Sequence, residues 1–301
     1  MTNKPKFSHP LLEKINSGKV LISDGGIGTY LQEHGLEPGG DPEEFNITNP
    51  ETVRKMAKDY YDSGSDIVLT NSFGGTTFRQ KHYGLESKVS ELNKQAALIT
   101  RSQTPKGKFV LGSMGPTGQF LEPYGDISEK DMYAAFKQQA IALAEGGVDG
   151  VVIETMTAIE EASIAIKAVS ENTDLLIAAT MTFDKGPRGY FTMMGITPEV
   201  AAVELTKAGA HIVGSNCGNG IANMIEIATK MRNSTDNPIL IHSNAGIPSM
   251  KSGKIIYVET PEYMVEGFMK LKNIGINIIG GCCGTTPDHI KALSQSIKKD
   301  N

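Results

Sequence analysis

The sequence contains no tryptophan, only three cysteines, and a 6% share of aromatic residues in 301. So few aromatic side chains argue against a platform on which single-stranded bases could stack. The 29 lysines and arginines are scattered among 34 aspartates and glutamates, and the formal net charge is −5. Because no basic stripe is present, we expect no nucleic-acid partner.

Long apolar runs are also missing. No run approaches the ~20 residues that a membrane-spanning helix needs, and the polar residues 1–19 do not resemble a signal peptide. An odd number of cysteines, two of them adjacent, is a poor framework for disulfides and suits a reducing compartment. These absences predict a cytoplasmic protein without a membrane partner.

The sequence does contain a regular succession of eight short apolar runs. Their hydrophobicity is continuous rather than alternating, which is typical of parallel strands that are buried on both faces. The runs cover residues 20–22, 67–69, 109–111, 151–153, 175–179, 211–213, 238–241 and 276–279.

Helical patterns lie between these runs. Several begin with Thr-Pro, which places proline at the first helical position, where its missing N–H is tolerated. Asn49 and Ser128 are candidate N-caps, and Gly64 and Gly146 are candidate stop signals. The expected helices cover residues 50–63, 128–145, 158–170, 198–207, 221–231, 261–272 and 287–298.

Eight strand–helix units predict an α/β fold of the (β/α)8 TIM barrel type. We expect a single domain over residues 1–301, with its core at about 18–297. A doubly wound open sheet is the main rival, but the glycines at 25, 26 and 28 lack the spacing of a dinucleotide-binding fingerprint. The hydrophilic residues 33–49 are expected to form a long first loop over the top of the barrel.

All three cysteines follow apolar runs, at the end of a barrel where catalytic residues gather. Cys217 stands alone after the sixth run, and Cys282 and Cys283 are adjacent after the eighth. Three thiolates can bind one Zn²⁺ and leave a fourth position open, as in catalytic zinc sites. Adjacent strand residues point to opposite faces, so the last strand must break at the pair; Gly284 and the glycines before the pair allow this. The alternative is that the cysteines are small buried hydrophobic residues.

A site of three thiolates is better suited to activating a thiol than to activating water. A free thiol has a pKa of about 8.5 and is mostly protonated at pH 7, whereas a metal-bound thiol is deprotonated outright. The cysteines therefore indicate a site that prepares a substrate thiol for nucleophilic attack.

Other polar residues also end apolar runs. Asp24 follows the first run and Glu154 the fourth, with no lysine or arginine nearby in sequence, so the two carboxylates suit a cation such as an α-ammonium. Alternatively, Asp24 only forms a turn, and Glu154 only has a role in packing or in an ion pair. Asn244 is either a polar strand cap or a neutral ligand for the open zinc position. His211 and His242 show no metal-ligand spacing, and we interpret both as structural.

With these residues the sequence resembles the zinc-dependent homocysteine S-methyltransferases over about residues 18–297. The resemblance implies a TIM barrel with zinc on the three cysteines and homocysteine bound through its sulfur, its ammonium near Asp24 and Glu154. The expected substrate site also includes Gly25, Gly26, Asn71, Thr155 and Asn216. The motifs that carry the resemblance are Gly280-Gly281-Cys282-Cys283-Gly284-Thr285-x-Pro287, Asp24-Gly25-Gly26-x-Gly28-Thr29, Glu154-Thr155 and Gly214-x-Asn216-Cys217.

Within this family the sequence is most similar to the homocysteine domain of cobalamin-dependent methionine synthase, through residues 41–50, 70–73 and 243–248. This similarity implies that Asn244 is a zinc ligand that yields to the substrate. It also implies methylcobalamin as the methyl donor and methionine as the product. The 301 residues contain no folate, cobalamin or reactivation domain and no Asp-x-His-x-x-Gly motif, so we expect a separate corrinoid protein as partner.

Three alternatives remain open from the sequence. In the first, the donor is a free small molecule such as S-methylmethionine or betaine. In the second, the acceptor is another thiol such as coenzyme M. In the third, the chain is a zinc- or thiol-binding subunit of a larger assembly without turnover of its own.

Overall fold

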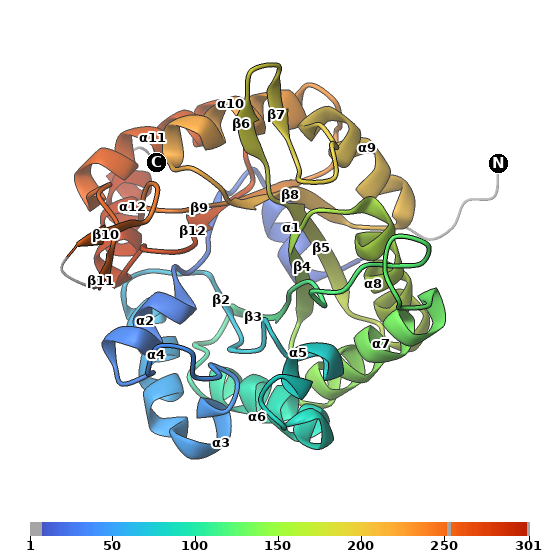
Figure 1. The fold of residues 1–301 in the computed structure, drawn as a ribbon. Coiled ribbons are helices and arrows are strands. Elements are labelled where there is room, and N and C mark those ends of the chain that lie inside the picture. The colour runs from blue at the N-terminus through green and yellow to red at the C-terminus, as the bar shows by residue number, and fades with distance from the viewer. Residues whose placement is uncertain (1–7, 252–253, 300–301) are drawn as a thin grey trace.

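Eight parallel strands form a ring at the centre of the molecule, and helices surround it (Figure 1). The computed structural model describes residues 8–251 and 254–299. In the ring the strands follow the order β1-β12-β9-β8-β5-β4-β3-β2. Read backwards from β2, each strand is followed by the next ring strand along the chain, and β1 lies beside β12. They are β1 (Leu21–Ile22), β2 (Ile67–Leu69), β3 (Phe109–Met114), β4 (Gly150–Met156), β5 (Leu176–Met181), β8 (Ile212–Cys217), β9 (Ile239–Ser243) and β12 (Ile278–Gly281).

The seam between β1 and β2 is closed by two aspartates. The N–H of Asp66 donates to the carbonyl of Ile22, and the N–H of Ile22 donates to the Asp66 carboxylate. Farther up the seam, the N–H of Leu69 donates to Oδ2 of Asp24 at 2.7 Å. The two edge strands are therefore joined largely through side chains, and the predicted TIM barrel is confirmed.

Long helices cover the outside of the ring. They are α4 (Pro50–Asp62), α6 (Val89–Ser102), α7 (Glu129–Glu145), α8 (Ile159–Asn172), α9 (Pro198–Ala208), α10 (Ile221–Arg232), α11 (Pro261–Asn273) and α12 (Pro287–Lys299). Shorter elements are α1 (Pro10–Asn16), α2 (Ile27–Glu33), α3 (Phe45–Thr48), α5 (Thr77–Lys81), η1 (Glu86–Lys88) and the hairpins β6–β7 (Asp184–Gly186, Gly189–Phe191) and β10–β11 (Ser249–Lys251, Lys254–Ile256).

The hydrophobic core has two parts, which explains why the strands are apolar on both faces. One cluster lies inside the ring and contains Leu111 and Ile212 together with Leu11 and Ile15 of α1. A larger cluster contains side chains of the strands and of the surrounding helices. Helix α1 therefore shares the interior cluster with the strands.

The helix predictions hold, but one of the long helices was missed. All seven expected helices are present with ends displaced by no more than two residues, and the Ser128 hydroxyl caps α7 by accepting from the N–H of Asp131 at 3.1 Å. Helix α6 (Val89–Ser102) was not predicted, because Lys88 at its N-cap position offers no capping side chain. Asn49 occupies the N-cap position of α4, as predicted, although its side chain makes no capping hydrogen bond. No helix in the described ranges is long and apolar enough to cross a membrane.

The strand that ends at Cys217 depends on a close approach between backbones at Gly214. A Cβ atom at Gly214 would lie 1.8 Å from the carbonyl oxygen of Leu240, its register partner on β9. We expect Gly214→Ala to lower the free energy of unfolding in urea by about 1–3 kcal/mol, the usual cost of overpacking. The control is Gly28→Ala, where a Cβ meets nothing within 4 Å. A Gly214→Ala protein as stable as the wild type would contradict this account of the β8–β9 contact.

Candidate active site

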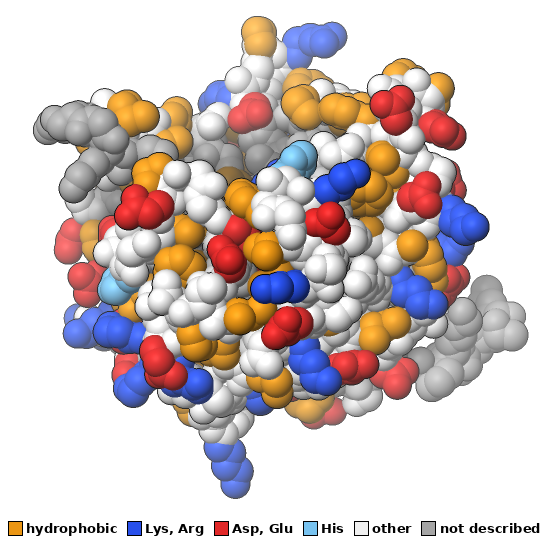
Figure 2. Space-filling view, turned by 60° about the horizontal axis from the view of Figure 1, so that its bottom comes forward, with side chains coloured by type: hydrophobic (Ala, Val, Ile, Leu, Met, Phe, Trp, Pro, Cys, Tyr) orange, Lys and Arg blue, Asp and Glu red, His pale blue; other side chains and the backbone are white. Residues whose placement is uncertain are grey.

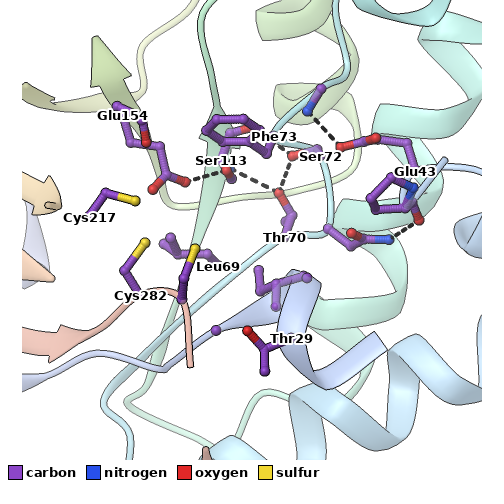
Figure 3. Close-up of a pocket in the computed structure, with 18 of the residues that line it drawn as sticks. Thr29, Glu43, Leu69, Thr70, Ser72, Phe73, Ser113, Glu154, Cys217 and Cys282 are labelled. Atoms are coloured by element: carbon purple, nitrogen blue, oxygen red, sulfur yellow. Dashed lines mark hydrogen bonds between the residues drawn. The ribbon is translucent and has the colours of Figure 1, made fainter. Parts of the chain in front are cut away.

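The three cysteines come together at the C-terminal rim of the barrel. Strand β8 ends at Cys217, and β12 ends at Gly281, directly before Cys282 and Cys283. The three Sγ atoms all lie within 4.8 Å of one another, an arrangement that can hold one metal ion. Figure 3 shows the sulfurs of Cys217 and Cys282 side by side, close to Glu154, and strand β9 separates the two strands that carry them. The expected break of the last strand before the cysteine pair is confirmed.

The backbone at Cys217 has an uncommon conformation. Its φ is +65°, in the left-handed region that non-glycine residues rarely adopt, and Gly218 follows with a φ of +73°. Such a conformation costs on the order of 1–3 kcal/mol and persists only where the surrounding structure enforces it. Here it ends β8 and directs the thiol toward the other two.

Asn216 ties the ends of three strands together beneath the thiols. Its Oδ1 accepts from the N–H of Thr155 and from Oγ1 of Thr180, both at 2.7 Å. Its Nδ2 donates to Oγ1 of Thr155 at 2.7 Å and to Oε2 of Glu154 at 3.2 Å. The polar atoms of Asn216 and Thr155 therefore bond each other and the neighbouring side chains.

Glu154 is the acidic residue nearest to the thiols in the cavity wall. Its side chain is buried, and its Oε1 accepts a hydrogen bond from the hydroxyl of Ser113 (Figure 3). Burial raises the pKa of Glu154 to about 7, although the Ser113 bond favours the charged form. A cation that entered the cavity would offset the burial cost and favour ionisation.

Asp24 is also buried, but its carboxylate lies at the β1–β2 seam. It bonds the N–H of Leu69 and the hydroxyl of Ser23, and the residue is not part of the cavity wall. Burial raises its pKa to about 7. The structure thus brings Glu154 into the cavity and places Asp24 directly behind its wall.

A cavity of about 250 Å³ lies above the thiols. Its wall includes Gly25, Gly26 and Asn71 of the expected substrate site. A Cβ on Gly26 would lie 2.8 Å from the carbonyl oxygen of Cys282, so only glycine lets the first loop pass so closely. The amide of Asn71 donates to the carbonyl of Pro42 at 2.6 Å and thereby holds the long first loop.

Residues of that loop form part of the cavity wall, as predicted for residues 33–49. Asp41, Pro42 and Glu43 line the cavity together with Phe73 and Arg79. On the face drawn in Figure 2, basic and acidic side chains are interspersed.

Asn244 lies beside the thiols with one atom unsatisfied. Its Nδ2 donates to the carbonyl of Gly218 at 2.8 Å, whereas its buried Oδ1 has no hydrogen-bond partner among the described residues. A buried acceptor without a hydrogen-bond partner costs on the order of 1–3 kcal/mol of stability. The unsatisfied oxygen therefore indicates that a ligand binds to it.

Without a metal, the three thiols interact strongly with one another. Hydrogen bonds from Cys217 and Cys282 lower the pKa of the Cys283 thiol to about 3. The hydrogen bonds that Cys282 makes to Cys217 and Cys283 raise its own pKa well above the usual value. One thiolate in the cluster therefore opposes the formation of a second. A bound cation is needed to keep all three cysteines deprotonated.

Several residues of the site were not recognised in the sequence. Ser113 and Thr180 end apolar runs, and their polarity at these positions is the signal that was available. The ring of Tyr257, directly after β11, packs against Gly284, and its sequence position carried no such signal. His242 lines the cavity, and burial lowers its pKa to about 3, so it is neutral there. His211 bonds the N–H of Ile177 at 3.0 Å, which agrees with a structural role.

Comparison with known proteins agrees with this geometry. Residues 21–297 match the family model described as homocysteine S-methyltransferase. The methionine synthase of Mycobacterium leprae is 29% identical to the chain over 319 aligned positions, which cover 99% of this chain and 26% of that protein. The chain thus spans about a quarter of the length of this relative.

Solved structures show the same fold. The homocysteine methyltransferase MmuM of Escherichia coli, in its metallated form, superposes with a TM-score of 0.79 at 21% identity, covering 96% of this chain and 100% of that one. The 3-dehydroquinate dehydratase of Geobacillus kaustophilus superposes with a TM-score of 0.52 at 9% identity, covering 93% of this chain and 92% of that one.

A TIM barrel with a cluster of three thiols at its C-terminal rim defines the class of protein as an α/β barrel with a candidate metal centre. Since the family model covers nearly the whole chain, the chain belongs to the homocysteine S-methyltransferase family.

The raised pKa values of Glu154 and Asp24 predict how the metal-free protein responds to pH. Both carboxyls titrate near pH 7 when folded but near their model values of 4.5 and 3.8 when unfolded. Below the pKa values of the unfolded chain, both carboxyls are protonated in the folded and in the unfolded state. Their contribution to the free energy of unfolding is then fully present. As the pH rises to about 7 the unfolded chain alone loses these protons, so each group lowers the free energy of unfolding by up to about 1.4 kcal/mol per pH unit.

Urea unfolding at pH 5, 6 and 7 measures this slope. Glu154→Gln should make the slope shallower, whereas Glu160→Gln, at an exposed position on α8, should leave it unchanged. An unaltered slope in Glu154→Gln would show that this carboxyl is already ionised at pH 5.

Proposed function

We propose that the chain binds Zn²⁺ through Cys217, Cys282 and Cys283 and methylates the sulfur of homocysteine to give methionine. The observation that carries the proposal is the convergence of three thiols beside a buried carboxyl and an unpartnered amide oxygen. Three sulfurs and one exchangeable neutral oxygen are the donor set of a catalytic zinc site.

The fit to zinc depends on Asn244 as much as on the cysteines. Its Oδ1 is the candidate fourth ligand, and the sulfur of the substrate would replace it. When bound, the metal supplies Lewis-acid chemistry that keeps a thiol deprotonated at neutral pH. The need for a cation to hold three neighbouring thiolates supports the same assignment.

Glu154 is proposed to bind the α-ammonium of the substrate. A buried carboxyl with a pKa near 7 ionises when it pairs with a cation, so binding of the ammonium would fix its charge. Ser113 and Asn216 hold it in place on both oxygens. Asp24 adds negative charge from behind the wall rather than direct contact, and Gly25, Gly26, Asn71 and Thr155 shape the space around the substrate.

In the proposed reaction, a lone pair on the homocysteine sulfur forms the new S–C bond while the donor keeps the electron pair of the bond that breaks. The proton of the thiol has already left to solvent. The donor that we favour is methylcobalamin on a separate corrinoid protein. Support comes from the residues shared with the homocysteine domain of methionine synthase and from the relative of that name. A reducing, cytoplasmic location suits a site of three thiols.

One experiment tests the proposed donor and acceptor together with the alternatives. The zinc content of the purified protein is measured, and methionine formation from homocysteine is assayed with methylcobalamin, S-methylmethionine or betaine. Coenzyme M replaces homocysteine in a parallel series. We expect one zinc per chain and activity with methylcobalamin.

The matched variant is Cys217→Ala, because two thiolates hold zinc poorly. It should retain less than a tenth of the zinc and form no methionine. Full activity of metal-free protein would contradict the proposal, and so would full zinc content in Cys217→Ala. Zinc binding without turnover of any donor would instead favour a binding subunit.

A further inference from the structure

Strand β4 contains a bulge where it reaches the cavity. Its register with β5 shifts between Ile153 and Met156, which are three residues apart on β4 but pair with residues two apart on β5. Bulges next to active sites re-aim side chains, because one strand carries an extra residue. Here the bulge places two consecutive residues, Glu154 and Thr155, in the cavity wall.

Thr155 has the backbone conformation that glycine usually supplies in a bulge. Its φ is +60°, which is rare for a β-branched residue. Two hydrogen bonds to one side chain hold it there: its N–H donates to Oδ1 of Asn216, and its hydroxyl accepts from Nδ2, both at 2.7 Å. Threonine therefore supplies an acceptor for Asn216 that glycine would lack.

Asn216 also stands directly before the other strained residue of the site. Thr155 and Cys217 are the only non-glycine residues with a positive φ in the part of the chain that the structure describes. One of them follows Glu154, and the other is a candidate metal ligand. The fully buried side chain of Asn216 thus joins the carboxylate end of the site to its thiol end.

The amide nitrogen of Asn216 reaches both ends. One of its hydrogens is taken by the hydroxyl of Thr155, and the other faces Oε2 of Glu154 at 3.2 Å and, at a longer 4.0 Å, Sγ of Cys282. A carboxylate that pairs with an ammonium is a weaker acceptor, so this N–H can then turn toward the sulfur. The sulfur needs the hydrogen bond most when a fourth thiolate joins the metal.

We infer that Asn216 is a positioning residue that couples the two ends of the site, so that an ammonium at Glu154 strengthens the binding of the substrate sulfur to the metal. The inference rests on the proposed function, since it needs zinc on the thiols and an ammonium at Glu154. Coupling between two sites is reciprocal. It therefore makes the site selective for thiols that carry an α-amino group over thiols without one, such as coenzyme M.

The test compares two thiols that differ only in the amino group. Homocysteine and 4-mercaptobutyrate have the same chain and carboxylate, but 4-mercaptobutyrate lacks the ammonium. Their dissociation constants for the zinc-loaded protein are measured by isothermal titration calorimetry, after the zinc content of every protein has been determined. The readout is the ratio of the two constants, which a general loosening of the metal site would not change.

Asn216→Ala is the main variant. In the wild type we expect homocysteine to bind about 100-fold more tightly than 4-mercaptobutyrate, as for a hydrogen-bonded ion pair. In Asn216→Ala this preference should fall about tenfold, as for the loss of one hydrogen bond to a charged group, while the constant for 4-mercaptobutyrate stays within about threefold.

Two further variants complete the test. Thr155→Gly removes the hydroxyl that orients the amide of Asn216, and glycine adopts the φ of +60° freely, so this variant should fold and lose about threefold in preference. Thr182→Val is the matched control. The Thr182 hydroxyl donates to the main-chain carbonyl of Asn216 at 2.9 Å, so its loss spares the amide and should leave the preference unchanged.

An unchanged preference in Asn216→Ala, with both thiols weakened equally or not at all, would overturn this inference and leave the proposed function standing. If Asn216→Ala retains no zinc, Thr155→Gly decides in the same way. A wild type that retains no zinc, or that binds the two thiols equally, would overturn the proposed function as well.

Discussion

The parallel register of β8, β9 and β12 is the constraint on which the candidate site depends. Cys217 pairs with Ser243 of β9 on one side, and Gly281 pairs with the same residue on the other. The N–H of Cys282 then donates to the Ser243 carbonyl at 2.8 Å. One residue of β9 therefore sets the height of both cysteine-bearing strand ends, and a slip of either strand would separate the thiols.

This constraint explains the unusual features around it. Gly214 allows β8 to approach β9, and the strained backbone of Cys217 turns its thiol toward the pair. Asn216, one residue earlier, binds the end of β4 and so places Glu154 at the same level. Strain in one residue is thus balanced by a dense hydrogen-bond network that begins at its neighbour, as expected where function requires an uncommon conformation.

The sequence predicted the barrel and the thiol cluster because both depend on local patterns. Eight apolar runs mark the strands, and in a barrel everything that follows a strand gathers at one rim. Side-chain direction could not be predicted in this way. Asp24 and Glu154 look equivalent in the sequence, yet one carboxylate closes the β1–β2 seam and the other lines the cavity. The packing of Tyr257 against Gly284 was not predicted because it depends on a loop that returns to the rim from outside the barrel.

The central claim is that the three thiols hold zinc and leave one position for the sulfur of homocysteine. X-ray absorption at the zinc edge, recorded on the zinc-loaded protein with and without homocysteine, tests it most directly. We predict three sulfur ligands and one oxygen or nitrogen ligand in the free protein, changing to four sulfurs at about 2.3 Å when homocysteine is bound. An unchanged spectrum on saturation with homocysteine, or fewer than three sulfurs in the free protein, would contradict the account.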